Sequence, residues 1–199
     1  MKNYQGSSGE ARTAARRGKL LKAAAGVFAA RGFHGASVRS ICEAAGLTER
    51  YFYESFENTE ALFLALHQDT SERIVREMRE AVKNVPAQSG HQTQLETFFD
   101  FFSREPAAAR LFAVEAAYIS QSACDVCRAW RRTIRGLLWE QCAEQNNAVE
   151  ALVSEAIIKG LLSIAVEWMD NDFLQRREDI IAAGMSLLRL QNPATLSVS

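Results

Sequence analysis

The stretch from Ser37 to Phe56, SVRSICEAAGLTERYFYESF, limits most strongly what this chain can fold into. It predicts two short helices that meet at an angle across a tight turn. Gly46 ends the first helix, because glycine adopts the left-handed backbone conformation easily, and Leu47 fills the turn with an apolar side chain. Thr48 stands at the N-cap position of the second helix, where its hydroxyl can accept a backbone N–H.

The second helix of this pair begins with charged and aromatic residues. Arg50 and Tyr51 lie in its first turn, while Phe52 and Phe56 are spaced to face inward. Such a helix can lie in the major groove of DNA with its N-terminal residues against base edges. An ordinary helical hairpin fits the same residues, so this stretch alone leaves both interpretations open.

Composition favours an all-helical protein. Of the 199 residues, 48% are apolar and only three are proline, and no segment alternates as a series of strands would. We expect an all-α chain of about nine helices. Residues 1–60 carry a net charge of +3 and the remainder −4. A basic head on an acidic body suits a protein that touches phosphate at one end only.

The four cysteines and the chain start indicate a cytoplasmic protein with reduced thiols. The first 18 residues contain no hydrophobic run, and no segment spans 18 uncharged apolar residues. Cys124 and Cys127 form a CxxC pair that metal or redox chemistry can use, but no second pair follows and no histidine has matching ligand spacing. Small buried residues explain the pair better, and we expect no metal or cofactor.

Residues 1–11 are polar and rich in glycine and serine, which predicts a disordered arm. A helix then continues to about Arg31, and Gly32-Phe33 ends it. Its apolar stripe includes Ala24 and Phe28, and its start is basic. The basic side chains either follow a phosphate backbone or form a solvated helix start: Arg12, Arg16, Arg17, Lys19 and Lys22.

Residues 17–66 resemble the DNA-binding head of the tetracycline-repressor (TetR) family of bacterial transcriptional regulators. The likeness is continuous, without gaps, and covers about a quarter of the chain. The residues that carry it are Leu20-Leu21-x-Ala23-Ala24, Val27-Phe28, Gly32-Phe33, Ser37-Val38-x-x-Ile41, Ala44-Ala45-Gly46-Leu47-Thr48, Phe52-Tyr53, Phe56 and Glu60-x-Leu62.

This resemblance implies a three-helix helix-turn-helix head over residues 12–57 and roles for its polar residues. Ser37 and Tyr53 fall on positions that usually hold phosphate, and Thr48 on the capping hydroxyl of the recognition helix. Physical chemistry agrees, since hydroxyls at helix N-termini donate to phosphate oxygens. Three further residues are expected at DNA: Arg50 and Tyr51 at base edges, and Arg39 at the backbone.

Three residues depart from the family pattern. Ala36 stands where a threonine is common, which leaves Ser37 as the only hydroxyl there. Arg50 stands where many members have glycine, and Thr59 where many have lysine. These departures make the operator sequence unpredictable from relatives.

Residues 58–192 are expected to form an effector-binding and dimerisation domain, with a frayed tail over 193–199. Asn58 caps a long helix, Thr59 to about Asn84, that joins head to body, and residues 85–90 form a linker. The body is dense in aromatic residues, which are either core or the wall of an apolar pocket. The resemblance favours a pocket, with five candidate walls and one polar anchor: Phe98, Phe102, Phe112, Tyr118 and Trp139, with Glu115.

The segment from Ala148 to Met169 predicts the assembly. Its polar positions form one narrow stripe: Glu150, Ser154, Glu155, Lys159, Ser163 and Glu167. The apolar remainder is wider than one neighbouring helix can cover. A last helix, about Arg176 to Leu190, offers small residues that permit close helix contact. We expect a two-fold homodimer built on these two helices from each subunit.

These observations predict a ligand-responsive DNA-binding regulator, most simply a repressor released from a near-palindromic operator by a small apolar or aromatic effector. Two alternatives are an enzyme and a ligand-sensing binding module without operator DNA. The sequence offers no Ser/His/Asp, paired-carboxylate or metal constellation at usable spacing, so we expect no catalytic residues and no membrane partner.

Overall fold

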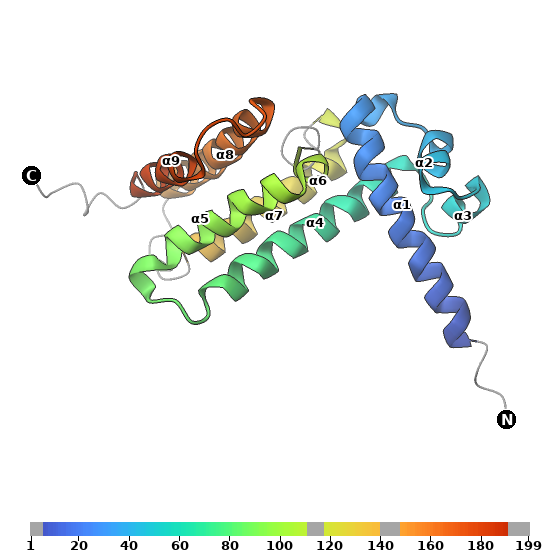
Figure 1. Cartoon of the computed structure of the whole chain (residues 1–199), viewed down its shortest axis with the longest axis horizontal. Coiled ribbons are helices and arrows are strands. Elements are labelled where there is room, and N and C mark those ends of the chain that lie inside the picture. Colours follow the sequence, from blue (N-terminus) through green and yellow to red (C-terminus); the bar gives the residue numbers. More distant parts are fainter. Residues whose placement is uncertain (1–5, 111–117, 140–147, 191–199) are drawn as a thin grey trace, which may run out of the picture.

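The computed structural model describes residues 6–110, 118–139 and 148–190, and all regular structure in these ranges is helical. Helices α1 (Gly6–Gly35), α2 (Val38–Ala45) and α3 (Glu49–Tyr53) form a head at one end of the molecule (Figure 1). The other helices form the body: α4 (Thr59–Val82), α5 (Ala87–Arg104), α6 (Pro106–Arg110), α7 (Gln121–Trp139), α8 (Ala148–Asp170) and α9 (Arg177–Arg189). The predicted all-α architecture is confirmed.

The turn between α2 and α3 has the predicted geometry. Gly46 has a φ of 64° and a ψ of 36°, which places it in the left-handed region where a side chain would be strained. Its N–H reaches the last carbonyls of α2 and closes that helix. Phe52 and Phe56 are both buried and point into the head, together with Ile41.

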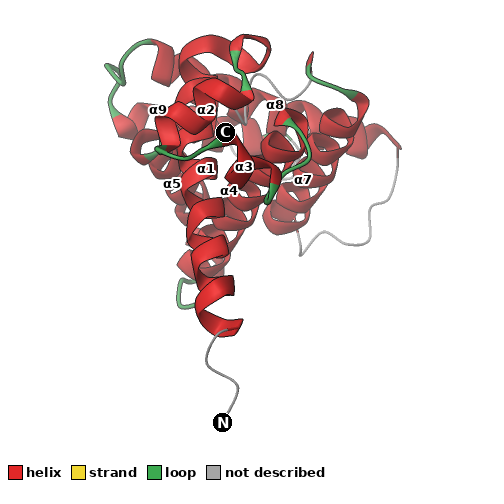
Figure 2. Cartoon of the chain, turned by 90° about the vertical axis from the view of Figure 1, so that its right-hand side faces the viewer, coloured by secondary structure: helices red, strands yellow, loops and turns green. Residues whose placement is uncertain are grey.

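Helix α1 is longer than the sequence predicts at both ends. It begins at Gly6, so residues 6–11 are helical rather than part of the expected arm. At its other end Gly32 has a non-helical φ of 68° and ψ of 170°, and the helix resumes to Gly35. Gly32 therefore kinks the helix instead of ending it. Figure 2 shows that the N-terminal half of α1 extends beyond the other helices.

Helix α4 belongs to two hydrophobic cores. Leu62 and Phe63 pack with the head residues, whereas Ile74 and Met78 pack with the body. The boundary expected between residues 57 and 58 thus runs through α4. Its start is as predicted, because the side-chain oxygen of Asn58 accepts the Ala61 N–H at 2.8 Å. Because α4 packs in both cores, a rigid movement of this helix would displace residues of the head and of the body together.

The predicted linker over residues 85–90 is shorter in the structure. Helix α5 already begins at Ala87, directly after Pro86, since proline ahead of a first helical turn sacrifices no intrahelical bond. Helix α5 then contributes the centre of the body core, with its phenylalanines almost fully buried: Phe98, Phe99, Phe101 and Phe102. Buried Gln94 donates to the Leu137 carbonyl at 3.1 Å, which ties α5 to α7.

Helices α8 and α9 pack on each other and on α5, at the side of the body away from the head (Figure 1). Ser154 was expected in the polar stripe of α8 but is buried, and its hydroxyl donates to the Ala151 carbonyl at 3.0 Å. A β-carbon on Gly184 would lie 3.1–3.2 Å from side chains of α5 and α8, so this glycine allows α9 to approach both. None of the helices within the described ranges has both the length and the apolar character needed to span a membrane.

Candidate nucleic-acid interface and ligand-binding body

Ser37 opens the first helix of the candidate interface. It has an extended backbone, and its side-chain oxygen accepts the Ser40 N–H at 3.1 Å while Ser40 Oγ accepts the Ser37 N–H at 3.0 Å. This reciprocal cap fixes the start of α2 and leaves the Ser37 side chain at the surface. Its hydroxyl hydrogen is therefore placed to donate to an incoming anion.

Thr48 occupies the N-cap of α3, but the predicted capping bond is not formed. Its side chain makes no capping hydrogen bond, and its carbonyl accepts the N–H groups of Tyr51 at 3.0 Å and Phe52 at 3.4 Å. Thr48 is exposed. The Thr48 hydroxyl therefore lies at the surface at the start of α3, where it can donate to a phosphate oxygen.

Arg50 and Tyr51, predicted together at base edges, differ in their surroundings. The Arg50 side chain is 84% exposed and holds an ion pair with Glu54, one helical turn on, at 3.3 Å. Tyr51 is half-buried, and the Arg16 guanidinium lies over its ring at 4.2 Å from the ring centre. One face of this phenol is therefore covered by α1, which the sequence did not indicate.

Arg39 and Tyr53 are both exposed, like Arg50. The Arg39 side chain pairs with Glu43 at 2.9 Å along the outer face of α2. Tyr53 packs edge-on against buried Phe52, with ring centres 5.4 Å apart, and presents its remaining surface to solvent. Arg39 and Tyr53 therefore lie at the surface of α2 and α3, the two short helices of the head that Figure 2 views from the head end of the molecule.

A buried histidine joins α4 to α7 where the head meets the body. His67 is 2% exposed, and its Nε2 lies 3.2 Å from Cys127 Sγ. Ser71 Oγ donates to the His67 carbonyl at 2.7 Å and lies 3.3 Å from Nδ1. Burial, and secondarily the charge of Arg131, lower the pKa of His67 to about 4. We assign a neutral ring, with Nδ1–H directed at Ser71 and Nε2 accepting the thiol hydrogen.

The same environment makes Cys127 an unreactive thiol. Burial raises its pKa to about 11, although the nearby Arg131 acts in the opposite direction. Cys124 is half-buried on the same helix. Within the described residues, no three His, Cys, Asp or Glu side chains are placed to hold a metal ion. Of the two cysteines, Cys127 is the one that contacts α4, through His67.

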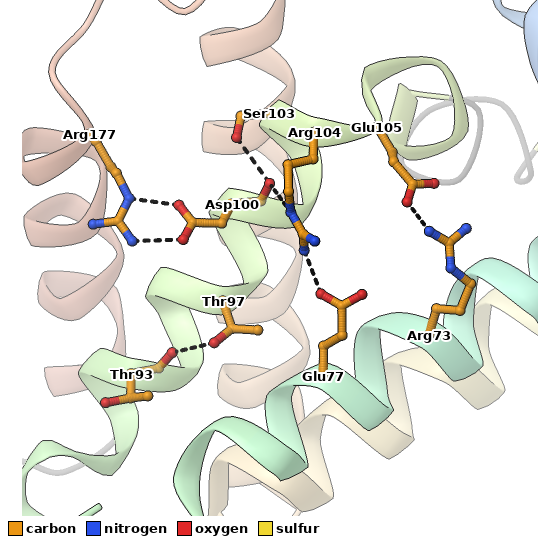
Figure 3. A network of polar contacts seen from close by, with 9 residues as sticks. All are labelled: Arg73, Glu77, Thr93, Thr97, Asp100, Ser103, Arg104, Glu105 and Arg177. Carbon is orange, nitrogen blue, oxygen red and sulfur yellow. Dashed lines mark hydrogen bonds and ion pairs between the residues drawn. The ribbon is translucent and has the colours of Figure 1, made fainter.

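Three ion pairs connect α4, α5 and α9 on one side of the body (Figure 3). Arg177 of α9 forms a two-pronged pair with Asp100 of α5, at 2.6 and 2.9 Å. One turn on, the Arg104 side chain reaches both the Asp100 carbonyl and Glu77 of α4. A further pair joins α4 to the end of α5, between Arg73 and Glu105. The sequence could not show these pairs, because the partners are 27 to 77 residues apart.

The predicted ligand-binding residues fall in three different settings. Phe98 and Phe102 are buried and face each other with ring centres 4.9 Å apart, and Trp139 is partly buried against the same core. Tyr118 is 82% exposed, so in this conformation it does not line the body core. Phe112 and Glu115 lie outside the described residues.

Known proteins resemble this chain both in its head and over its body. Residues 20–66 match the family described as "Bacterial regulatory proteins, tetR family". The HTH-type transcriptional activator FasR of Mycolicibacterium smegmatis is 29% identical over 164 residues, which are 79% of this chain and 74% of FasR.

Two solved structures share the fold over nearly the whole chain. The fatty acid degradation regulator FadR of Bacillus halodurans has a TM-score of 0.71 at 20% identity, covering 88% of this chain and 94% of its own. FadR of Bacillus subtilis in complex with stearoyl-CoA has a TM-score of 0.69 at 20% identity, covering 87% and 96%. These relatives are regulators rather than enzymes, in agreement with the sequence prediction. Residues 20–66 therefore form a domain of the tetR family of bacterial regulatory proteins, and the chain as a whole shares the fold of such regulators.

Proposed function

We propose that two copies of this chain bind a near-palindromic operator through their heads and leave it when an apolar effector enters the body. The observation that carries this proposal is the exposed polar set at the outer end of the head. It consists of hydroxyl and guanidinium groups on α2 and α3: Ser37, Arg39, Thr48, Arg50 and Tyr53. The head rests on a core that shares α4 with the body, so the two functions are mechanically connected.

The proposed contacts follow from the chemistry of each group. Ser37, Thr48 and Tyr53 donate hydroxyl hydrogens to phosphate oxygens, and Arg39 adds a charge-assisted contact to the backbone. Arg50, whose side chain is 84% exposed, can pair in two-pronged fashion with the O6 and N7 acceptors of guanine. Tyr51 keeps its proposed place at the groove with the face that Arg16 does not cover. We place this DNA-binding regulator in the bacterial cytoplasm, where its operator DNA would lie.

The proposed dimer interface is the outer face of α8 and α9. Leu152 is 70% exposed and Val149 68% exposed on α8, and Leu190 is also exposed just beyond α9. Large apolar side chains on one face of a single chain favour burial against a second copy. A two-fold axis through this face would join α8 and α9 of both subunits in a four-helix bundle and orient the two heads for successive major grooves.

We infer that the effector carries an acyl chain, and a long-chain acyl-CoA is the compound to test first. The support is twofold. The phenylalanines of α5 are buried and apolar, and FadR of Bacillus subtilis was crystallised with stearoyl-CoA. Phe98, Phe102 and Trp139 are the proposed walls, and Tyr118, Phe112 and Glu115 remain candidates from the sequence.

The proposed switch uses the ion pairs of Figure 3. An effector that displaces the buried phenylalanines must move α5, and α5 is tied to α4 through Arg104–Glu77 and Arg73–Glu105. Movement of α4 then changes the spacing of the heads. A nearly complete switch needs the effector to favour the DNA-free conformation by about 5.5 kcal/mol.

Fluorescence anisotropy on a duplex selected by the protein from a random library tests the proposal. Binding should weaken steeply between low and high salt, because phosphate contacts release counterions. Arg50→Ala should reduce the preference for the selected duplex over a scrambled one, whereas Arg132→Ala on α7 should leave it unchanged. A chain that binds no duplex in preference to another would refute the regulator in favour of a ligand-sensing module.

The effector arm of the experiment separates a repressor from an activator. Stearoyl-CoA, stearate and free coenzyme A are added to the protein–duplex complex in turn. Release by stearoyl-CoA alone supports a repressor that is released by acyl-CoA. Release by stearate as well would show that the protein recognises the acyl chain rather than the coenzyme A group. Tighter DNA binding with stearoyl-CoA would contradict release and favour an activator, the role named for FasR.

A further inference from the structure

Arg16 of α1 makes two contacts with α3, which begins 33 residues later in the chain. Its guanidinium carbon lies 4.2 Å from the centre of the Tyr51 ring. Its Nη2 lies 3.5 Å from Glu54 Oε2 and donates to Thr13 Oγ1 at 3.2 Å. A planar guanidinium can stack with its face and bond with its edge at once, which a lysine ammonium cannot do.

Glu54 is shared between two arginines. Its Oε2 faces Arg16, and its Oε1 pairs with Arg50 Nε at 3.3 Å. Glu54 thus links the N-terminal half of α1 to the exposed Arg50 side chain of α3. Tyr51 and Glu54 are three residues apart, so they lie on the same side of the helical turn and one arginine can contact both.

Helix α3 depends on such contacts for its orientation. It has five residues, and an isolated helix of this length does not form in water because nucleation is unfavourable. Phe52 anchors its inner side in the head core. On the solvent side, Arg16 is the contact that spans both Tyr51 and Glu54.

We propose that Arg16 is a positioning residue for DNA reading, which holds α3 through Tyr51 and directs Arg50 through the carboxylate of Glu54. The inference rests on the proposed function. It adds a residue from the N-terminal half of α1 to the residues of α2 and α3 that are proposed to contact DNA. Arg16 lies outside residues 20–66, the part of the chain that matches the family. The family match therefore does not supply this role.

The charge balance explains why Arg16 affects selectivity more than affinity. With Arg16 present, the negative charge of Glu54 is divided between two guanidinium groups. Without it, Arg50 alone neutralises Glu54 and is drawn toward that carboxylate and away from a base edge. General attraction of the head for phosphate changes by only one charge, as it would for any exposed basic residue.

The test compares Arg16→Ala with Lys19→Ala in the full chain. Lys19 is exposed on the same helix, so both variants remove one positive charge from α1. Affinities are measured for the duplex selected by the wild-type protein and for a scrambled duplex. We expect Arg16→Ala to lower the ratio of the two affinities by roughly threefold to thirtyfold, from the loss of one cation–π contact and one ion pair. Lys19→Ala should weaken both affinities alike and leave the ratio unchanged.

Two further measurements identify the route through Glu54. A repeated selection with Arg16→Ala should relax the preference at the same base pair that Arg50→Ala relaxes. In a Glu54→Gln background, adding Arg16→Ala should change the ratio less than it does in the wild-type background, because the shared carboxylate is gone. Arg16→Lys, which keeps the charge without the planar stack, should restore only part of the ratio.

The outcomes separate failure of this inference from failure of the proposed function. A wild-type protein that prefers no duplex overturns both. A wild-type protein with a clear preference that Arg16→Ala retains in full, with native circular dichroism, overturns the positioning role alone. If Arg16→Ala does not fold, Arg16→Lys decides: a ratio below wild type supports the role, and a ratio equal to wild type overturns it.

Discussion

Acidification should destabilise this protein through one buried side chain, His67. The pKa of an unfolded histidine is about 6.5, and burial between α4 and α7 lowers the folded value to about 4. Above pH 6.5 the ring is neutral in both states and contributes no pH dependence. Between pH 6.5 and 4 the unfolded chain binds a proton that the folded chain does not, so stability falls as pH falls.

The size of the effect follows from the two pKa values. Their difference of about 2.5 corresponds to about 3 kcal/mol when complete, at about 1.4 kcal/mol for each pH unit. At pH 5 about 2 kcal/mol of this loss should be present. Protonation would also turn Nε2 into a donor, and the Cys127 thiol, 3.2 Å away, would have to rotate its hydrogen elsewhere.

Guanidinium unfolding at a series of pH values from 7.5 to 5, at one fixed protein concentration, measures this loss. The control is His67→Gln, which keeps a polar side chain at the site but does not titrate. The difference in unfolding free energy between wild type and His67→Gln should change by about 2 kcal/mol over this range. A difference that stays constant from pH 7.5 to 5 would refute the argument from burial.

Three further results are expected. Gly184→Ala should lower the melting temperature, because the new β-carbon meets three core side chains at 3.1–3.2 Å. The control Gly136→Ala meets nothing within 4 Å and should stabilise α7 by up to about 1 kcal/mol. Equal changes in melting temperature for the two variants would contradict this packing. Leu152→Arg should shift sedimentation from dimer to monomer and lower operator affinity. A variant that still sediments as a dimer would show that the dimer interface lies on another face of the chain. Iodoacetamide at pH 7.5 should label Cys124 faster than Cys127, whose pKa is raised to about 11; equal rates in native protein would count against the buried Cys127–His67 contact.

Local patterns predicted the head well because its folding rules are local. The i, i+4 spacing of Phe52 and Phe56 fixed their inward direction, and Gly46 ended α2 in the conformation that glycine favours. The capping role of Asn58 was equally visible. The prediction for Thr48 was wrong in one respect, because this residue occupies the N-cap position without forming the capping hydrogen bond.

Contacts between distant residues could not be read from the sequence. Arg16 over Tyr51, His67 beside Cys127 and Arg177 on Asp100 each depend on how helices pack in three dimensions. Ser154 shows the limit of polarity as a guide, because a hydroxyl that bonds to its own helix is buried at little cost. Exposed Tyr118 shows that aromatic density alone does not identify the wall of a pocket.

Hydroxyl-radical footprinting of the wild-type protein on its selected duplex tests most directly whether two exposed α2–α3 surfaces read one operator. Two protected patches should appear on the same face of the DNA, with centres about one helical turn apart, and Arg50→Ala should weaken both equally. A single patch, two patches on opposite faces, or protection unaffected by Arg50→Ala would contradict a dimer that reads DNA through these helices.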